Sequence, residues 1–286
     1  MTGSGLVVVD KSGGMTSHDV VARARRLLGT RKVGHAGTLD PMATGVLVLG
    51  VNRATRLLGH LVLTEKAYDA TVRLGVTTTT DDAEGEVVAE VSTAALDEAT
   101  IRAAAAEFVG DLMQVPTAVS AIKVRGRRAY ERVRAGEDVE LAARPVTVHE
   151  LVVTEVRGDE LDLSVRCSSG TYVRAIARDL GARLGVGGHL TALRRTAVGP
   201  YDLAAARTLE ELEGLPADEV LLPIGDAVRA AFPVVELDEA AATDVRHGRA
   251  LDLPLDALTA VFAPDGEFLA LYEPRDGRAR AVAVFT

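Results

Sequence analysis

Cysteine is almost absent from this sequence: Cys167 is the only one among 286 residues. The chain therefore forms no disulfide bond with itself and no zinc site built from several cysteines, which fits a reducing cytoplasm. Apolar runs are also short, and none approaches the roughly 20 residues that a membrane-spanning helix requires. The first residues lack both the basic segment and the long apolar core of a secretory signal. These absences predict a cytoplasmic protein with no membrane segment.

Two glycine-rich segments invite a test for nucleotide binding, and neither has the required context. Gly3-Ser4-Gly5 comes before its predicted strand, whereas a dinucleotide fingerprint follows a strand. Gly185 to Gly188 follows a predicted helix and has no Lys-Ser or Lys-Thr pair. A metabolic enzyme that holds phosphates in these loops is therefore disfavoured, and we expect no cofactor and no metal ion.

The net charge of −9 conceals an uneven distribution of charge along the chain. Residues 1–60 and 120–200 carry net charges of +5 and +4, while residues 61–119 and 201–286 carry −8 and −10. Arginine far outnumbers lysine, and arginine suits bidentate phosphate contact and stacking on bases. A localised basic face is what nucleic-acid binding needs, although the counts alone fit a general preference for arginine equally well.

Residues 16 to 29 carry the clearest helix signals. Thr16 and Asp19 form a capping-box pattern, so the helix is expected to begin at Thr16 or Ser17. Gly29 is a stop signal directly after Leu28. Further helices are expected at residues 53–61, 96–109 and 172–184.

The strand signals predict an α+β fold. Residues 66–76 alternate between apolar and polar side chains, which is typical of a half-buried strand, and Gly158-Asp159 is expected to turn a pair of strands at residues 146–156 and 161–167. Other strands are expected at residues 6–9, 46–51, 87–91 and 189–201. Because strands and helices mix without regular βαβ alternation, we predict a mixed, largely antiparallel sheet flanked by helices. A change of composition near residue 230 divides the chain into a large domain, 1–229, and a small β-rich domain, 230–286.

Asp40 is the most conspicuous candidate for chemistry. It lies in the segment Gly34–Gly45, which contains three glycines, and the apolar run Val46–Val51 follows. Pro41 biases Asp40 toward an extended conformation. A carboxylate in such a rigid loop beside a buried strand is positioned rather than merely solvated. The alternative is an ordinary Asp-Pro surface turn.

Five segments, taken in order, resemble one family. They are Asp10–Ser17, Gly34–Gly45, Glu65–Tyr68, Pro116–Tyr130 and Cys167–Arg174. In this order and spacing they are similar to the TruB family, the bacterial synthases of pseudouridine 55 in tRNA. The resemblance covers roughly residues 5–200, and the coincidence of five ordered motifs makes it specific. The C-terminal residues are more loosely similar to the PUA-like tail domain of that family.

This resemblance implies a pseudouridine synthase fold and an isomerase that acts on the T-loop of tRNA. The reaction breaks the N1–C1′ glycosidic bond, turns the uracil and rejoins it through C5. It needs no redox change and no group donor, so the resemblance implies no cofactor. The expected partner is the T-arm of tRNA, and we expect a monomer.

The resemblance also implies three catalytic residues. Asp40 matches the catalytic aspartate, which either adds to C1′ or removes a 2′ proton to give a glycal; the sequence leaves both routes open. Arg174 matches the ion-pair partner of that aspartate, and without such a cation a carboxylate taken out of water tends to become protonated. Tyr68 matches the tyrosine that stacks on the target base and is implicated in proton loss from C5.

Further residues match positions that contact RNA. His35 matches a histidine that fills the space left in the loop when the base is turned out. Tyr172 and Leu193 resemble residues that line the pocket of the base. Lys11 and Lys123 are expected either to contact the RNA backbone or to brace the active-site loop. Candidate phosphate contacts, for which a solvated surface position is the alternative, are Arg125, Arg127, Arg128, Arg194 and Arg195.

A second class of function stays open at this point. The chain would also fit a factor that binds and folds tRNA, because turning out and releasing the T-loop remodels tRNA whether or not a base is modified. The joint presence of Asp40, Tyr68 and Arg174 favours catalysis. Two departures bear on RNA contact: Ala67 and Asp69 flank Tyr68 where the family often has Thr and a basic or polar residue, and the tail domain is acidic.

Overall fold

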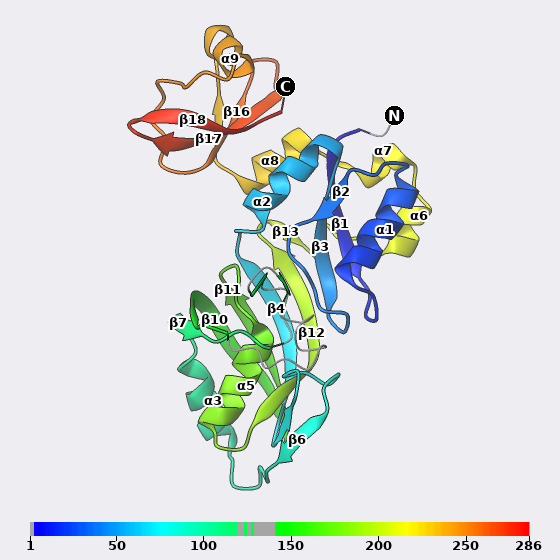
Figure 1. Ribbon diagram of the computed structural model, residues 1–286, viewed down its shortest axis with the longest axis vertical. Coiled ribbons are helices and arrows are strands. Elements are labelled where there is room, and N and C mark those ends of the chain that lie inside the picture. Colours follow the sequence, from blue (N-terminus) through cyan, green and yellow to red (C-terminus); the bar gives the residue numbers. More distant parts are fainter. Residues whose placement is uncertain (1–2, 119–122, 125–126, 129–140, 286) are drawn as a thin grey trace.

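In this computed structural model the described part of the chain covers residues 3–118, 123–124, 127–128 and 141–285 (Figure 1). Within it, ten strands form one sheet with the main path β14-β1-β3-β12-β4-β11-β10-β7; β13 pairs with β12, and β2 pairs with β3. The strands are β1 (Gly5–Lys11), β2 (Val33–His35), β3 (Thr44–Val51), β4 (Lys66–Leu74), β7 (Gly110–Gln114), β10 (Arg144–Arg157), β11 (Glu160–Cys167), β12 (Gly188–Val198), β13 (Tyr201–Asp202) and β14 (Leu222–Pro223). The pairings of this described sheet are antiparallel apart from that of β3 with β12, so the α+β prediction is confirmed.

Helices cover this sheet in two groups. Helix α5 packs on β12 and β4, α3 on β10, α1 on β2, and α6 on β1 (Figure 1). The helices of this part are α1 (Ser17–Leu27), the 3-10 helix η1 (Asn52–Leu57), α2 (Leu58–Leu61), α3 (Glu98–Ala106), α5 (Val173–Arg183), α6 (Leu209–Glu213), α7 (Ala217–Val220) and α8 (Ile224–Ala231). Two small hairpins lie outside the sheet: β5 (Val76–Thr78) with β6 (Val87–Glu90), and β8 (Lys123–Val124) with β9 (Arg127–Arg128).

The parallel junction between β3 and β12 places the loop that carries Asp40. Gly45 at the start of β3 pairs with Arg195 of β12, and its φ of 98° lies in the left-handed region that favours glycine. A Cβ atom at this position would lie 2.2 Å from the Arg195 carbonyl oxygen. Only glycine therefore lets the two backbones approach, and this approach sets where the preceding loop leaves the sheet.

Helix α1 holds the other side of that loop. Its capping box is present as predicted, with Thr16 accepting a hydrogen bond from the Asp19 backbone and Asp19 accepting one from the Thr16 backbone. The next residue, Ser17, is buried; its hydroxyl donates to the Leu39 carbonyl at 3.2 Å and accepts from the Leu39 amide at 2.9 Å. The residue before Asp40 is thus fixed to the first turn of the helix.

A second sheet forms the C-terminal part of the chain. It has the order β15-β16-β17-β18, with β15 (Val234–Glu236), β16 (Thr259–Phe262), β17 (Phe268–Arg275), β18 (Arg278–Val284) and the helix α9 (Glu239–Arg246) beside it. Buried apolar residues of β16 and β17 share one cluster with β1, β3 and α8. The guanidinium of Arg53 donates to the Phe285 carbonyl at 2.8 Å. Residue 230 lies inside α8, so the division at 229/230 stays a prediction.

Several expected elements are present, and others differ. Strands β1, β3, β4, β6, β10, β11 and β12 and helices α1, α3 and α5 occur where the pattern predicted them, with ends moved by a few residues. The predicted helix at 53–61 begins instead as a 3-10 helix and ends with one α-helical turn. Strand β7 and the short helices α6 to α9 were not predicted. Strand β7 lies at the edge of the sheet, and its apolar Met113 is largely exposed while its polar Gln114 is buried, so the sequence lacks the apolar-in, polar-out alternation that marks a half-buried strand.

Candidate active site

Asp40 lies at a pocket of about 270 Å³ formed where three parts of the chain meet. The loop before β3 contributes Gly37 to Asp40, β4 contributes Lys66 and Tyr68, and the segment leading into α5 contributes residues 169–174. Val62, Leu193 and Arg195 complete the lining. The Asp40 side chain is 35% exposed and borders a pocket that is open to solvent, so the residue does not form an ordinary surface turn.

The predicted ion pair between Asp40 and Arg174 is present. The Arg174 Nε atom lies 3.0 Å from the Asp40 Oδ2 atom, and only 4% of the arginine side chain is exposed. The same guanidinium lies 3.3 Å from the Oδ2 atom of Asp82, whose side chain is 5% exposed, and donates to the Thr80 carbonyl at 2.9 Å. The buried Arg174 guanidinium therefore pairs with two carboxylates, those of Asp40 and Asp82, and both fix its position.

Burial and charge act in opposite directions on Asp40. Burial raises the pKa of its carboxyl above the ordinary value, and the Arg174 guanidinium opposes this rise. The nearby Asp82 carboxylate adds to the rise, while the Lys11 ammonium opposes it. The ionised state that either chemical route requires thus depends on Arg174.

Lys11 braces the loop of Asp40. Its side chain is fully buried, and its ammonium donates to the carbonyls of Ser12, Met15 and Pro41 at 2.9, 2.7 and 3.2 Å. Burial lowers the pKa of Lys11 to about 8, and the Asp40 carboxylate opposes the change. Of the two roles expected for Lys11, contact with the RNA backbone does not fit, because no part of the side chain reaches the surface.

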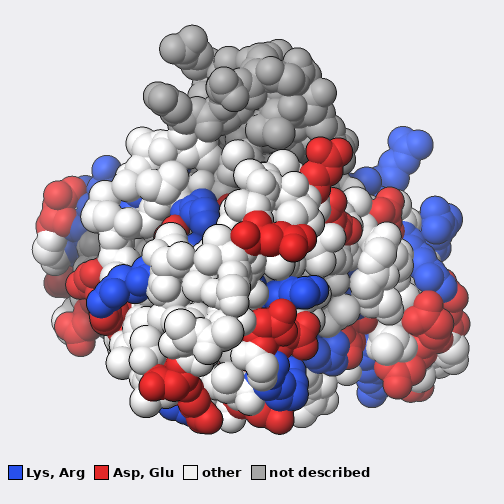
Figure 2. Space-filling model, turned by 90° about the horizontal axis from the view of Figure 1, so that it is seen from below, with Lys and Arg blue, Asp and Glu red and all other residues white. Residues whose placement is uncertain are grey.

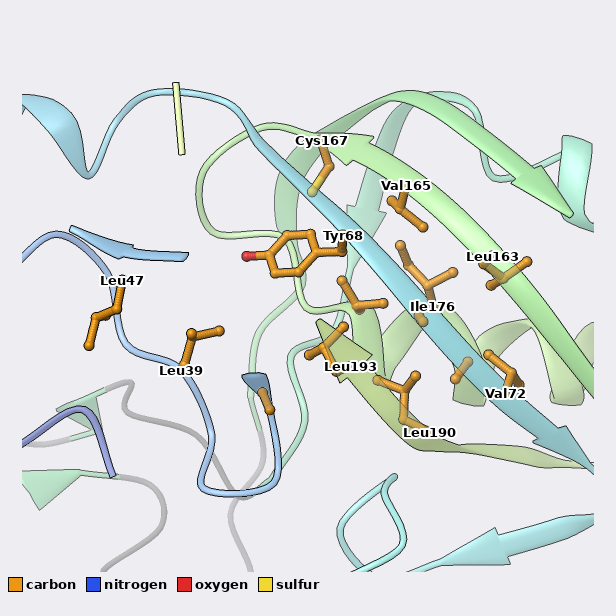
Figure 3. Close-up of a cluster of buried hydrophobic side chains, with 14 of the residues drawn as sticks. Leu39, Leu47, Tyr68, Val72, Leu163, Val165, Cys167, Ile176, Leu190 and Leu193 are labelled. Atoms are coloured by element: carbon orange, nitrogen blue, oxygen red, sulfur yellow. The ribbon is translucent and has the colours of Figure 1, made fainter. Parts of the chain in front are cut away.

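Tyr68 and Leu193 form the apolar wall of the pocket. Tyr68 lies on β4 and is buried, and its ring packs beside Leu193 and Cys167 (Figure 3). The hydroxyl group points away from Ile176 and toward the side where Leu39 lies (Figure 3). Burial raises the pKa of this hydroxyl, and Arg195 opposes the rise. The tyrosine is therefore neutral near pH 7, with its polar end toward the loop of Asp40.

Arg194 and Arg195, neighbours on β12, do not share one role. The Arg194 guanidinium makes a bidentate ion pair with Asp10 at 3.1 and 2.7 Å and is partly exposed. Arg195 is 1% exposed and donates to backbone carbonyls, so the predicted phosphate contact at Arg195 is corrected. Successive residues of a strand face opposite sides of a sheet, and two adjacent arginines therefore cannot form one surface.

The remaining predicted residues are spread around the pocket or lie beyond the described structure. Tyr172 is the N-cap residue of α5 and lines the pocket. His35 lies on β2, and its ring meets that of His18 edge-on at 5.6 Å; it is not part of the pocket lining. Lys123 belongs to β8 and Arg127 and Arg128 form β9, but their side chains, like all of Arg125, lie outside the described residues.

Two buried residues of the site were missed by the sequence analysis. Asp82 came from a tract interpreted only as a polar loop, and no local pattern marks it as buried. Gln114 holds the segment before Arg174: its amide donates to the Tyr172 carbonyl at 3.1 Å, and its carbonyl accepts from the Tyr172 amide at 2.8 Å. Gln114 lies two residues before a recognised motif, which was the available signal.

Charges of both signs are mixed on the surface near one end of the molecule. One end of the molecule has Asp and Glu side chains interspersed with Lys and Arg, so that face does not form a continuous basic area (Figure 2).

Among the described residues, no group of three or more His, Cys, Asp or Glu side chains is arranged to hold a metal ion. In the same part of the chain, no helix combines the length and the apolarity needed to span a membrane.

Three protein-family models match consecutive parts of the chain. Residues 25–173 match the N-terminal domain of the TruB family of pseudouridylate synthases. Residues 174–229 match the C-terminal domain of tRNA pseudouridylate synthase B, and residues 232–286 match the C-terminal part of tRNA pseudouridine synthase II. The matches together span almost the whole sequence.

Curated proteins and solved structures agree with these matches. Proteins called tRNA pseudouridine synthase B from Arthrobacter sp. (strain FB24) and Nocardia farcinica are 58% and 60% identical, over 99% and 98% of this chain and 96% and 92% of their own length. A crystal structure of a Cbf5-Nop10-Gar1 complex superposes with a TM-score of 0.76 and 28% identity, over 99% of this chain and 84% of that one. A structure of an H/ACA RNP bound to a substrate RNA containing 2′-deoxyuridine gives 0.74 and 25%, over 99% and 85%.

Proposed function

The chain belongs to the TruB family of pseudouridylate synthases, and on this basis we propose that it isomerises the T-loop uridine at position 55 of tRNA to pseudouridine. The observation that carries this proposal is the buried Arg174 guanidinium 3.0 Å from Asp40 in a pocket that also contains Tyr68. A carboxylate paired with a buried cation at the side of a pocket is the group that the glycosidic chemistry needs.

Asp40, Tyr68 and Arg174 each have a separate role in the proposed reaction. The target nucleotide leaves the folded T-loop at a cost of a few kcal/mol, and its uracil stacks on Tyr68, which returns about 1–3 kcal/mol. Asp40 then either adds to C1′ or takes a 2′ proton as the N1–C1′ bond breaks. After the uracil turns, the C5–C1′ bond forms as Asp40 is displaced from C1′ or, on the glycal route, as C2′ takes its proton back from Asp40. C5 then loses its proton and N1 gains one, so the product has the composition of the substrate and Asp40 is free again. Arg174 keeps Asp40 ionised and directed at the ribose.

The resemblance to the TruB family and the composition of the chain support further roles. His35 fills the space left in the T-loop, and Leu193 and Tyr172 border the flipped nucleotide. The chain acts on tRNA in the cytoplasm as a monomer, with residues 230–286 as a PUA-like domain. A tRNA-folding activity that does not require modification accompanies the reaction, because turning out the T-loop nucleotide itself remodels the RNA.

The test uses a T-arm hairpin made with uridine carrying tritium at C5. Since C5 loses its hydrogen when it becomes the glycosidic carbon, each conversion releases one tritium to water. We expect release equal to one target uridine per hairpin. An otherwise identical hairpin with cytidine at the target position is expected to release none, which controls for reaction at other uridines. A folded protein that binds the hairpin and releases no tritium, from it or from whole tRNA, would contradict the proposal.

A further inference from the structure

Arg195 occupies a central position in the sheet beside the pocket. On one side of β12 it lies directly opposite Tyr68 of β4, and on the other it pairs with Gly45 of β3. The strand irregularity between Arg195 and Ala197 begins at the same residue. Arg195 therefore connects the strand that carries Tyr68 to the strand that follows the loop of Asp40.

The buried guanidinium is committed to this loop and this strand. Its Nε atom donates to the Val46 carbonyl at 2.7 Å, one terminal nitrogen donates to the Gly37 carbonyl at 3.2 Å, and the other to the Thr38 carbonyl at 3.4 Å. The two loop carbonyls belong to residues two and three positions before Asp40. A Cβ atom at Gly37, whose φ is 94°, would lie 3.6 Å from the same guanidinium.

The Tyr68 side chain lies beside the same guanidinium. Residues directly opposite each other on neighbouring antiparallel strands have their side chains on one face of the sheet, and both side chains line the pocket. The charge of Arg195 also opposes the rise that burial causes in the pKa of the Tyr68 hydroxyl. One planar cation thus lies beside the tyrosine and holds the backbone of the loop.

We propose that Arg195 is a positioning residue that holds the Tyr68 hydroxyl and the Gly37–Asp40 loop at a fixed separation across the pocket. This inference rests on the proposed function, since it concerns how the base on Tyr68 is aligned with the carboxylate of Asp40. It also accounts for an arginine that is buried and yet close to the site. Lysine at this position keeps the charge but replaces the planar fork by one ammonium, which cannot donate to the Val46, Gly37 and Thr38 carbonyls in the same geometry.

The experiment is a double-mutant cycle with Arg195→Lys and Tyr68→Phe, measured by tritium release under single-turnover conditions and followed for days so that slow variants remain measurable. We expect Arg195→Lys to lower the maximal single-turnover rate constant by about 100-fold, the loss that a misplacement of about 1 Å causes, with the affinity for the hairpin nearly unchanged. Because Arg195 holds both the tyrosine hydroxyl and the loop, its effect is expected to be clearly smaller in the Tyr68→Phe background, where only its hold on the loop is left to lose. The acidic limb of the pH profile is expected to stay in place, since Arg174 still pairs with Asp40.

Control variants distinguish a loss of positioning by Arg195 from a loss of folding and from a failure of the proposed function. Arg183→Lys makes the same change at an exposed arginine of α5 that pairs with Glu107, and its conversion is expected to match the parent. Thermal unfolding checks each variant, and Arg195→Gln takes the place of a lysine variant that does not fold. Losses that multiply in the double variant, or an unchanged single-turnover rate constant for Arg195→Lys, overturn the proposal that Arg195 holds both groups and leave the enzyme assignment intact. A parent protein without conversion overturns the proposed function itself.

Discussion

Asp40→Asn is expected to lose at least about 10,000-fold in tritium release while its affinity for the T-arm hairpin stays close to that of the parent. Losses of this order follow removal of a group that takes part directly in bond making and breaking. Asparagine has nearly the shape of aspartate, so the loop held by Ser17 and Lys11 keeps its conformation. What disappears is the negative charge that both chemical routes need.

A matched variant makes this result specific. Asp159→Asn removes a carboxylate from the exposed turn between β10 and β11, where it pairs with Arg73, and its rate is expected to equal that of the parent. Conversion by Asp40→Asn at the parental rate would reject Asp40 as the catalyst. If the parent and Asp40→Asn bind the hairpin equally and neither forms pseudouridine, the chain is an RNA-binding factor.

Arg174→Gln is expected to lower conversion by several hundred-fold near pH 7 and to move the acidic limb of the pH profile to higher pH. Burial already raises the pKa of Asp40, and Arg174 is the main group that opposes the rise. When this cation is removed, the pKa rises further, so a smaller fraction of Asp40 is ionised at a given pH. Activity should therefore partly recover as the pH increases. The measurement is kcat/KM against pH for parent and variant.

The thermal stability of the Arg174 variants must be measured together with their activity, because the Arg174 guanidinium also pairs with Asp82. Breaking a buried ion pair by removing one partner costs about 3–5 kcal/mol, so Arg174→Gln is expected to unfold at a lower temperature. Arg174→Lys keeps a cation and gives a folded variant with a smaller shift of the same limb. A loss of rate with no movement of the limb in either variant would mean that Arg174 does not control the ionisation of Asp40.

Local signals account for the parts of the fold that were predicted. The capping box at Thr16 and Asp19 fixed the start of α1, and the turn at Gly158 fixed the hairpin of β10 and β11. The junction of β3 with β12 is different, because Gly45 and Arg195 are far apart in sequence and no local pattern relates them. Edge strand β7 was missed because little of it is buried.

The difference between local sequence signals and contacts between distant residues also explains which site residues were predicted. The motifs that resemble the TruB family pointed to Asp40, Tyr68 and Arg174, and the fold brings all three to one pocket. The burial of Asp82 arises only when the tract before β6 packs against the start of α5, which the sequence does not reveal. Burial also reassigns Lys11 and Arg195 from expected RNA contacts to groups that hold the loop of Asp40.

The role of Asp40 and its pocket is tested most directly by a structure of the Asp40→Asn protein bound to a T-arm hairpin with an unmodified target uridine. We expect this nucleotide to be turned out of the loop, with its uracil against the Tyr68 ring and its C1′ and 2′ hydroxyl beside residue 40 and the Arg174 guanidinium. A uridine that stays stacked in the hairpin, or that binds away from this pocket, would contradict it.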